Sequence, residues 1–437
     1  AEQLMNTLKK YALSEIPHYK VHGRTVPGTC PLPLFFSGSA VELNVSGSEL
    51  WASLEVTWQN LEIWVTVEVN RELMSRQMLM PGKQSLCLFR GMSEESVKNV
   101  RITRETQAMV EDEDCCLLVQ GFQTDGSFHP IPRGKYTLEF VGDSITSGEG
   151  TYGAKGDLGW IPMYMSYSRC YAKMTAEALG ADAYMISKGG WGVLSSWDNN
   201  PDCNIPSRYE QLCGLCCGNK NESLGAFAPY DFTVRKTDAV IVNLGTNDAS
   251  AFQQPAWHDP ATGRTFKQHL NPDGAFAEED LTRFEDAVVS FLQIAEHTGV
   301  VDIVGLLHIV ARGPELGRRG VVGHDKERFQ LHRPVGILHA TADRASPLGG
   351  SSESPGHLGS LGRGVDGDER VEAPGHGIGI LGVEVEKRII VGMAARSLGR
   401  IVRSGLAVGL CHGNRPIVVG ACALVAHSLA YVESEEV

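Results

Sequence analysis

The sequence predicts an all-β sandwich followed by an α/β domain built on a parallel sheet. Three observations predict it. Residues 20–130 hold short runs with the alternation of half-buried strands, and from residue 136 apolar strands alternate with helical segments. Between them, "TDGSFHPIPRGK" (124–135) is rich in Gly and Pro. We place the domains at 1–134 and 135–305, and an atypical tail at 306–437.

The first domain is predicted from period-two patterns. In "LEIWVTVEV" (61–69) the residues at odd positions are all apolar and share one face of a strand, and "VELNV" (41–45) repeats the pattern. "SGSEL" and "MPGKQS" supply turn residues between such runs. Several short strands at this spacing indicate a β-sandwich or jelly roll.

The second domain is predicted from four apolar strands with helices between them. The strands are "TLEFVG" (137–142), "AYMIS" (183–187), "AVIVNLG" (239–245) and "VDIVGLL" (301–307). One helix is expected to begin at a capping Ser168 and to end at Gly180, and apolar residues three or four apart predict another over 278–297. Such alternation predicts a parallel sheet with helices on both faces, and places function at the carboxyl ends of its strands.

The net charge and the apolar content exclude some classes of binding partner. The formal charge is −13, whereas nucleic acid and anionic membranes reward clustered Lys and Arg, so we expect neither as a partner. The longest apolar run, 417–432, is short and contains His427, which argues against a membrane span. The first residues show no signal-peptide pattern.

The eleven cysteines are odd in number and scattered, which indicates reduced thiols and slightly favours a cytoplasmic location. Cys213-x-x-Cys216-Cys217, with Cys203 upstream, leaves a zinc site open as an alternative. No second pair stands at the spacing of a zinc finger. We therefore expect loop thiols, no metal and no cofactor.

The tail differs from the rest of the chain. Residues 301–437 contain two aromatic residues, Phe329 and Tyr431, against thirty before them, and Arg outnumbers Lys by 13 to 2. Two interpretations remain open. One is a native Gly-rich or disordered extension. The other, which we favour, is out-of-frame translation, because a shifted frame can replace aromatic residues and Lys by Arg and Gly.

Three segments that follow predicted strands carry residues suited to acyl transfer: "GDSIT" (142–146), "SKGGWG" (187–192) and "NLGTND" (243–248). Because the carboxyl ends of parallel strands meet at one edge, Ser144, Gly190 and Asn247 are expected to converge. Acyl transfer needs a hydroxyl nucleophile and donors aimed at the carbonyl oxygen as it becomes an anion. A glycine N–H and an asparagine amide are such donors, and Gly189 and Gly192 remain alternatives to Gly190.

These segments resemble blocks I, II and III of the SGNH (GDSL) hydrolase superfamily. Ser144 matches the serine of block I, Gly190 the glycine of block II and Asn247 the asparagine of block III. "EFVGDSITSGEG", "WGVLSSWDN" and "VNLGTNDASAF" narrow the resemblance to the two-domain group similar to carbohydrate esterase family 2. "LPLFFSGSAVELNVSGSELW" and "LFRGM" fit the jelly-roll domain of that group, and the match covers about residues 20–305.

The resemblance implies a flavodoxin-like hydrolase domain and an esterase that removes acetyl groups from sugars or polysaccharides. Ser144 would attack the acetyl carbonyl, and its own N–H, the Gly190 N–H and the Asn247 amide would hold the oxyanion. A histidine would act as general base. The family places this histidine in an Asp-x-x-His or His-Pro context, and the tail contains no Asp-x-x-His. His357 and His376, each in "PGH", are only weak candidates.

Other interpretations remain open. The chain would be a glycan-binding relic of an esterase if the base is lost, or, more weakly, a lipase-like acylhydrolase. Gly148-x-Gly150-x-x-Gly153 matches a dinucleotide fingerprint, but it begins too far after its strand and no helix obviously follows. Asp248 is expected to fix its loop. Four tryptophans near the three segments could contact sugar rings or pack in loops: Trp160, Trp191, Trp197 and Trp257.

Overall fold

A computed structural model of the chain describes residues 8–299, apart from residues 27, 155, 156 and 158. Beyond residue 299 it describes backbone strands alone, the last of which ends at Gly420. The weak candidates His357 and His376, and most of the predicted tail, lie outside the described residues.

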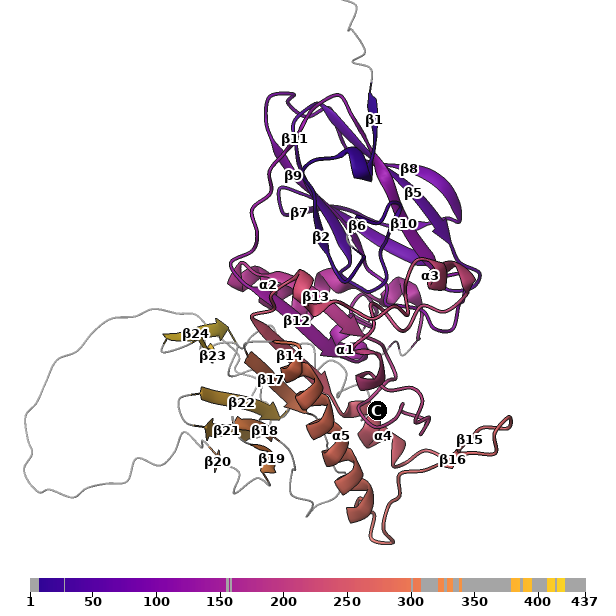
Figure 1. Cartoon of the computed structure of the whole chain (residues 1–437), viewed down its shortest axis with the longest axis vertical. Helices are drawn as coiled ribbons and strands as arrows, with labels where there is room; N and C mark the ends of the chain where they lie inside the picture. Colours follow the sequence, from indigo (N-terminus) through magenta and orange to yellow (C-terminus); the bar gives the residue numbers. More distant parts are fainter. Residues whose placement is uncertain are drawn as a thin grey trace, which may run out of the picture.

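The amino-terminal part of the chain is a sandwich of two antiparallel sheets (Figure 1). One sheet contains β1 (Lys9–Ala12), β3 (Leu32–Pro33), β5 (Glu49–Thr57), β8 (Gly82–Arg90) and β10 (Cys116–Thr124). The other contains β2 (Lys20–His22), β4 (Ala40–Val45), β6 (Ile63–Val69), β7 (Glu72–Leu79), β9 (Lys98–Arg104) and β11 (Phe128–His129). The strands expected around 41–45 and 61–69 are therefore confirmed as β4 and β6, although Leu61 precedes its strand.

Strand β6 is buried on both faces, which the alternating pattern did not indicate. Ile63, Val65 and Val67 are 0% exposed and form part of the sandwich core. On the opposite face Thr66 is 0% exposed, and Glu68 accepts a hydrogen bond from Lys173 Nζ at 2.8 Å. The polar face is covered because the second half of the chain packs against it.

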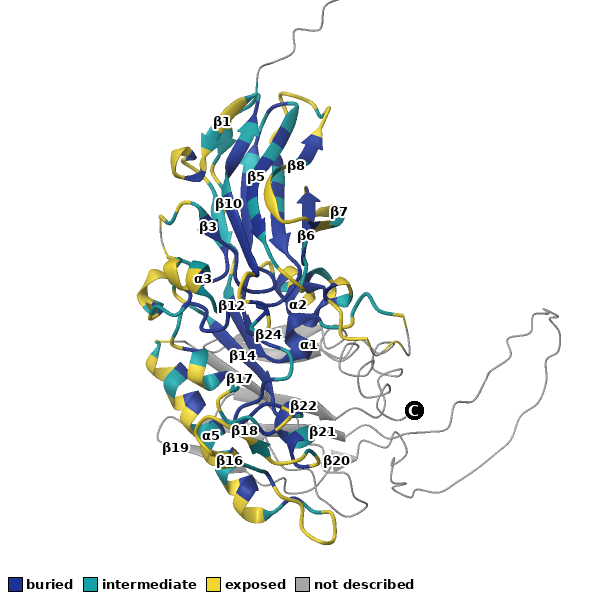
Figure 2. Ribbon diagram, turned by 90° about the vertical axis from the view of Figure 1, so that its right-hand side faces the viewer, coloured by how far each residue is buried: buried dark blue, intermediate teal, exposed yellow. Residues whose placement is uncertain are grey.

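The second half is built on a parallel sheet in the order β13-β12-β14-β17. Its strands are β12 (Thr137–Gly142), β13 (Asp182–Ser187), β14 (Ala239–Leu244) and β17 (Asp302–Leu307). The four predicted strands are thus confirmed to within one residue. Figure 2 shows β12 and β14 buried along their length, as expected for strands covered on both faces.

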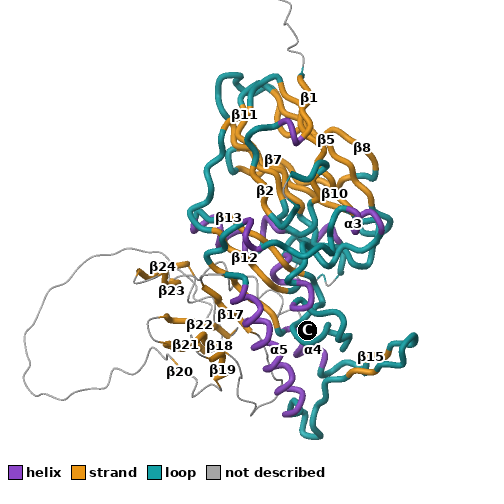
Figure 3. The backbone as a smooth tube through the Cα atoms, viewed as in Figure 1, coloured by secondary structure: helices purple, strands orange, loops and turns teal. Residues whose placement is uncertain are grey.

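Helices cover both faces of this sheet. The helices are α1 (Ser144–Ser147), α2 (Tyr171–Leu179), α3 (Asn219–Ser223), α4 (Thr246–Ala251) and α5 (Glu278–His297), drawn in purple in Figure 3. Phe140 of β12 packs edge-to-face on Tyr171 of α2 at 5.8 Å. The preceding residue, Glu139, accepts a hydrogen bond from Tyr209, whose ring packs on Phe291 of α5. Because successive strand residues point to opposite faces, α2 and α5 lie on opposite sides.

The second predicted helix is confirmed, and the start of the first is wrong. The apolar stripe of α5 is buried as its spacing predicts, and α2 ends at Gly180 in the left-handed conformation. However, α2 begins at Tyr171, and Ser168 lies in a short 3-10 turn, Tyr167–Arg169. The Ser168 hydroxyl donates to the Glu105 carboxylate at 2.5 Å instead of capping the helix. A contact with the sandwich therefore replaces the local cap.

The remaining elements are short. Four other 3-10 turns are η1 (Leu13–Glu15), η2 (Pro162–Tyr164), η4 (Pro206–Arg208) and η5 (Phe232–Val234). The hairpin β15 (Trp257–His258) and β16 (Thr265–Phe266) extends away from the body beyond α4 (Figures 1 and 3). In the tail the backbone strands are β18 (Val321–Asp325), β19 (Arg328–His332), β20 (Leu338–His339), β21 (Gly379–Val385), β22 (Arg388–Ala394), β23 (Ala407–His412) and β24 (Arg415–Gly420). The tail strands pair antiparallel with one another.

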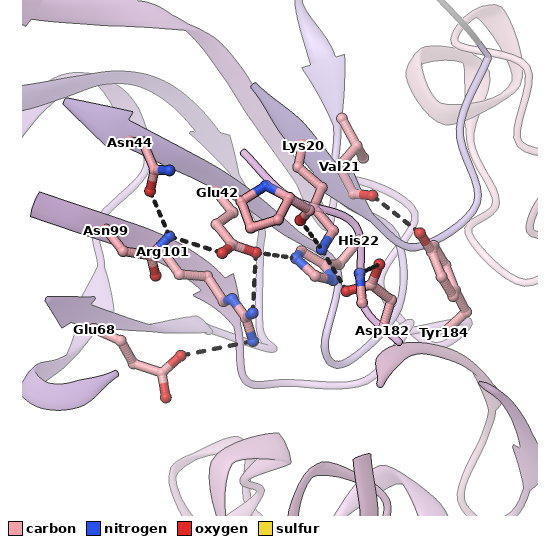
Figure 4. Close-up of polar contacts among 12 residues, drawn as sticks. Lys20, Val21, His22, Glu42, Asn44, Glu68, Asn99, Arg101, Asp182 and Tyr184 are labelled. Carbon is pink, nitrogen blue, oxygen red and sulfur yellow. Dashed lines mark hydrogen bonds and ion pairs between the residues drawn. The ribbon is translucent and has the colours of Figure 1, made fainter. Parts of the chain in front are cut away.

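The two halves share polar contacts along an extensive interface. Figure 4 shows one part, where Lys20 of β2 pairs with Asp182 of β13 at 2.5 Å and the Tyr184 hydroxyl donates to the Val21 carbonyl. Beside them the buried His22 hydrogen-bonds Glu42 at 2.7 Å. Burial and the Arg101 charge lower the pKa of His22 to about 4, so the imidazole is neutral near pH 7.

Loops of the sandwich also enter the core of the second half. Phe35, Phe36 and Ala108 belong to the same buried cluster as the strands of the parallel sheet. We propose a domain boundary near residue 134, since the last sandwich strand ends at His129 and the parallel sheet begins at Thr137. The two halves thus separate clearly along the sequence, whereas their hydrophobic cores are partly shared.

The nine cysteines of the described residues are free thiols, and five of them are fully or almost fully buried: Cys115, Cys116, Cys170, Cys213 and Cys216. No group of three or more potential metal ligands is present among the described residues. In the same part of the chain, no helix combines the length and the apolar character needed to cross a bilayer.

Candidate active site

The register of the parallel sheet brings the three predicted segments to one edge. Gly142, the last residue of β12, pairs with Ser187 on one side and with Asn243 on the other. Ser144, Gly190 and Asn247 follow these paired residues by two to four positions. Their backbones therefore leave the sheet at the same level, as the sequence predicted.

Ser144 is the first residue of α1 and is 7% exposed. The preceding Asp143 caps the helix, because its carboxylate accepts the Ile145 N–H at 3.0 Å. Among the described residues, none hydrogen-bonds to the Ser144 hydroxyl or accepts from its N–H. The group expected to be the nucleophile is thus enclosed and has no other engagement within the described structure.

Gly190 stands in a tight turn directly after β13. The turn is closed by the Trp191 N–H, which donates to the Lys188 carbonyl at 3.3 Å. Gly190 has φ +80°, the left-handed conformation that a type II turn requires at its third position and that glycine adopts without strain. The next tryptophan along the loop, Trp197, donates its backbone N–H to the Gly190 carbonyl at 2.9 Å.

The hydrogen bonds of the backbone N–H groups distinguish Gly190 from the two alternative donors, Gly189 and Gly192. The Gly189 N–H donates to Gln107 Oε1 at 2.7 Å, and the Gly192 N–H donates to the Ser195 carbonyl at 2.9 Å. The Gly190 N–H has no acceptor among the described residues. Of the three glycines, Gly190 is therefore the one whose N–H is available to a substrate oxygen.

Asn247 lies in the first turn of α4 and is 8% exposed. Its Nδ2 donates to the Trp191 carbonyl at 3.0 Å, so the side-chain amide lies directly beside the Gly190 turn. An asparagine amide has two N–H groups, and one remains for another acceptor. The donors expected to form an oxyanion hole are thus adjacent in space although they come from two different strand ends.

Asp248 fixes this arrangement, as expected. Its buried carboxylate accepts the backbone N–H groups of Val193, Leu194 and Ser195 at 2.7 to 3.3 Å. A Cβ at Gly192 would lie 2.2 Å from Asp248 Oδ2, so only glycine permits the approach. Helix α4 and the loop after β13 are therefore held together by one carboxylate.

Buried carboxyl groups lie in the segments that carry Ser144 and Asn247. Burial raises the pKa of Asp143 to about 7, and the charges of Glu149 and Asp248 act in the same direction. Burial also raises the pKa of Asp248 to about 6, against the backbone N–H groups that lower it. Part of this acidic cluster is protonated near neutral pH.

Among residues 8–299, no histidine whose side chain is described hydrogen-bonds to Ser144. His269 is held by a carboxylate, since its Nδ1 lies 2.9 Å from Asp280 Oδ2, but its side chain is 62% exposed and that carboxylate also pairs with Arg283. His258 lies on the β15–β16 hairpin. None of these histidines is therefore placed beside Ser144 by a hydrogen bond.

The tryptophans around the three segments differ in exposure. Trp160 is 41% and Trp197 49% exposed, whereas Trp191 is 7% exposed. Trp257 is half-buried on β15 and lies under the Arg264 guanidinium. Trp197 is the one that lies against the turn, because a Cβ at Gly190 would be 3.1 Å from its Cδ1.

Sequence reasoning missed three polar residues around the site. Glu149 lies against the Gly189 turn, Gln107 reaches it from the sandwich, and Lys188 is buried and paired with Glu111 at 2.7 Å. Lys188 lies within "SKGGWG" and Glu149 within "EFVGDSITSGEG", but the sequence does not show that these two side chains are enclosed by the fold. Gln107 gave none, because it is 82 residues from its partner Gly189.

Comparison with known proteins identifies relatives among esterases, although no family model matches the chain. The chain is 26% identical over 254 residues to an acetylxylan esterase / glucomannan deacetylase of Cellvibrio japonicus, which covers 57% of this chain. It is 26% identical over 217 residues to the cellulase/esterase CelE of Acetivibrio thermocellus, which covers 49% of this chain. The matches span 66% and 24% of these two relatives, respectively.

Solved structures give a stronger match. An acetyl xylan esterase from the rumen bacterium Butyrivibrio proteoclasticus is 46% identical, with a TM-score of 0.67, over 69% of this chain and 81% of that one. A family two carbohydrate esterase from Clostridium thermocellum, solved with cellohexaose, shares the fold at 22% identity and a TM-score of 0.54, over 68% of this chain and 79% of that one. The parallel sheet with its three converging strand ends defines an SGNH hydrolase domain. This chain belongs to carbohydrate esterase family 2.

Proposed function

We propose that the protein is a serine esterase that removes acetyl groups from carbohydrates. One observation carries the proposal. The Ser144 hydroxyl lies at the same sheet edge as the Gly190 N–H and the Asn247 amide, and neither the hydroxyl nor the Gly190 N–H has a partner among the described residues. Buried polar groups in folded proteins normally have hydrogen-bond partners, so an enclosed hydroxyl and an unpaired N–H at one sheet edge need an explanation. Acyl transfer supplies one, because it requires a hydroxyl nucleophile and free donors for the oxyanion.

In the proposed reaction Ser144 Oγ attacks the acetyl carbonyl carbon and its proton passes to a base. The carbonyl oxygen becomes an oxyanion that accepts hydrogen bonds from the Ser144 N–H, the Gly190 N–H and Asn247 Nδ2. Collapse of this intermediate breaks the bond from the carbonyl carbon to the sugar oxygen, which takes the proton from the base and leaves as a hydroxyl. The remaining acetyl-serine is then hydrolysed by water. Each oxyanion donor typically contributes about 3–4 kcal/mol to stabilisation of the transition state.

The base is proposed to be a histidine from outside the described residues. A serine hydroxyl is a weak nucleophile at neutral pH unless an adjacent base takes its proton. The family pattern places this histidine near the end of the hydrolase domain, in the part of the chain where His357 and His376 stand. Neither has an acid at the family spacing. A new reading of the coding nucleic acid around codons 295–315 tests whether a shifted frame has replaced that block.

The proposed substrate is an acetylated sugar or polysaccharide. Trp160 and Trp197 are exposed, and their rings lie near Lys188 and against Gly190, respectively. Aromatic faces of this kind stack on sugar rings. Trp197 contacts the Gly190 turn directly, so a sugar stacked on it would place an O-acetyl group near the donors.

Hydrolysis of p-nitrophenyl acetate and of acetylated xylan by the full chain tests the proposal. Ser144→Ala is expected to lower the rate at least about 1000-fold, since the nucleophile is lost. Ser223→Ala is the matched control, because Ser223 is an exposed residue of α3 whose hydroxyl contacts only its own helix. It should retain the rate of the wild type.

Two other outcomes would select the alternatives. Equal background rates for the wild type and Ser144→Ala, together with retained binding to xylan, would indicate a glycan-binding protein that has lost its base. A preference for long-chain acyl esters over acetyl esters would indicate a lipase-like acylhydrolase.

A further inference from the structure

We propose that Gln107, a residue of the sandwich half of the chain, is a positioning residue for the oxyanion site of the hydrolase half. The inference rests on the proposed function, because it concerns the donor that Gly190 offers to the substrate. Gln107 would act through the Gly189–Gly190 backbone and would not touch the substrate.

The first contact is a hydrogen bond across the interface. Gln107 is 0% exposed, and its Oε1 accepts the Gly189 N–H at 2.7 Å. Gly189 immediately precedes Gly190 in the turn that ends with the Trp191 N–H on Lys188. The Lys188–Gly189 peptide, which comes directly before the peptide that carries the Gly190 N–H, is therefore oriented from one side by a side chain that does not belong to the hydrolase sheet.

The second contact joins Gln107 to the segment of the nucleophile. Its Nε2 donates to Glu149 Oε2 at 3.4 Å, and the Glu149 N–H donates to the Ser144 carbonyl at 3.0 Å. Glu149 Oε2 also lies 2.3 Å from the position that a Cβ at Gly189 would occupy. One amide thus bridges the segment that carries Ser144 and the turn that carries Gly190.

Gln107 is itself held rigidly. Arg104, which is 0% exposed, donates to the Gln107 carbonyl at 2.9 Å, to the Thr106 carbonyl at 3.0 Å and to the Leu34 carbonyl at 2.8 Å. A buried guanidinium with this many acceptors fixes the loop 104–107 in one conformation. The side chain of Gln107 is therefore a preorganised support.

The two contacts require an amide. Gly189 needs an acceptor and Glu149 needs a donor, and a glutamine side chain supplies both at once. A methionine has a similar shape and offers neither. A carboxylate supplies the acceptor only and places a second negative charge beside Glu149, whose own pKa is already raised by burial.

Amide hydrogen exchange in the full-length chain tests the support directly. Gln107→Met is expected to speed exchange at the Gly189 amide by at least about tenfold, because the acceptor is removed. The matched control is Gln120→Met, a half-buried sandwich glutamine whose amide bonds Glu55. It should leave the Gly189 rate unchanged. An unchanged Gly189 rate in Gln107→Met would overturn the proposal.

Kinetics test the consequence for the reaction. Misplacing a catalytic group by about 1 Å can cost 100-fold, so kcat of Gln107→Met is expected to fall about 10- to 100-fold while KM stays within about twofold. An unchanged kcat, or a change in KM alone, would reject the positioning role. If the wild type shows no hydrolysis that depends on Ser144, the proposed function fails, and the exchange experiment still decides the role of Gln107.

A second variant separates positioning from general stability and also serves if Gln107→Met does not fold. In Gln107→Glu the new carboxyl group and Glu149 can share a proton at low pH, which keeps both contacts. At higher pH both ionise and repel each other. The protection factor of the Gly189 amide should therefore fall as pH rises in this variant and stay level in the wild type. Parallel pH profiles of the two proteins would contradict the proposal.

Discussion

At the scale of single residues, the site contains carboxyl groups that the fold buries, although the ionised form of a carboxyl group is more stable in water. Asp143 is 1% exposed and Asp248 is 0% exposed, and each carries a raised pKa. Both accept backbone N–H groups that fix the segments beside Ser144 and Asn247. These residues therefore contribute geometry to the site, and their ionisation carries a cost in stability.

The pH dependence of stability is expected to reveal this cost. The folded pKa of Asp143 is about 7 and the ordinary value is 3.8, so the folded state binds the proton more tightly than the unfolded state between these values. Stability should therefore fall as pH rises from about 4 to about 7. Asp143→Asn keeps the helix cap but cannot ionise. The variant should match the wild type near pH 4 and exceed its stability by about 2–4 kcal/mol at pH 8.

Denaturant unfolding of both proteins at pH 4, 6 and 8 measures this difference. Groups that do not interact with Asp143 titrate alike in the two proteins and cancel, so the difference reports Asp143 together with its coupling to Glu149 and Asp248. A difference in stability that stays constant with pH would contradict the assignment of a raised pKa to Asp143.

Asn247 is expected to matter for the rate more than for binding. Asn247→Ala removes one of the proposed oxyanion donors and the contact with the Trp191 carbonyl, so kcat on p-nitrophenyl acetate should fall about 100- to 1000-fold with little change in KM. Asn60→Ala, an exposed turn residue of the sandwich, is the control. A loss confined to KM would indicate that Asn247 binds the ground state.

At the scale of elements, the loop after β13 and helix α4 form one unit. The Asp248 carboxylate occupies the space that a side chain at position 192 would need. Tight backbone packing of this kind allows two strand ends to present donors at a fixed separation. The element is therefore sensitive to a single added methyl group.

Gly192→Ala tests this packing. The new Cβ would lie 2.2 Å from Asp248 Oδ2 and 2.5 Å from the Ser195 carbonyl, so the loop must move. We expect a loss of about 1–3 kcal/mol in the free energy of unfolding and a fall in esterase rate. Gly263→Ala is the comparison, because nothing lies within 4 Å of its Cβ and backbone strain alone opposes it. That variant should keep the wild-type rate, and equal rates for the two variants would count against the packing argument.

At the scale of the whole molecule, the two halves are joined by buried charges as well as by apolar contacts. Arg24, from the amino-terminal half, pairs with Glu139 of β12 at 2.9 Å, and the two side chains are 1% and 2% exposed. The guanidinium lies 4.3 Å from the centre of the Tyr230 ring and also donates to the carbonyl of Tyr209. This contact joins the sandwich to the centre of the parallel sheet.

Arg24→Met is expected to lower the stability of the whole chain by about 3–5 kcal/mol, because the buried Glu139 carboxylate loses the nearer of its two guanidinium partners and keeps only Arg235 at 3.9 Å. Replacing Glu139 by Gln in the same protein should recover part of the loss. The midpoint of guanidinium unfolding measures the change. Arg264→Met, which breaks the exposed pair with Asp202, should leave the midpoint unchanged. Equal effects of Arg24→Met and Arg264→Met would show that the interface pair is unimportant.

Much of the fold could be predicted because its signals are local. Strand β14 is indicated by an apolar run, and helix α5 by apolar residues three or four positions apart. Parallel pairing then follows from the alternation of strands and helices along the chain. The start of α2 was wrong because the Ser168 hydroxyl bonds Glu105, which is 63 residues away. Burial of both faces of β6 was missed for the same reason, since the covering surface comes from the other half of the chain.

The sequence by itself determined which strands precede Ser144, Gly190 and Asn247 and that the ends of these strands share one edge, because short-range patterns specify strands and parallel strands must align their ends. Only the tertiary structure decided which of the three glycines keeps an unpaired N–H, since that depends on acceptors from Gln107 and Ser195. It alone placed Gln107 beside Gly189 and Arg24 beside Glu139. Such contacts join residues 82 and 115 positions apart, and no local pattern encodes a partner at that distance.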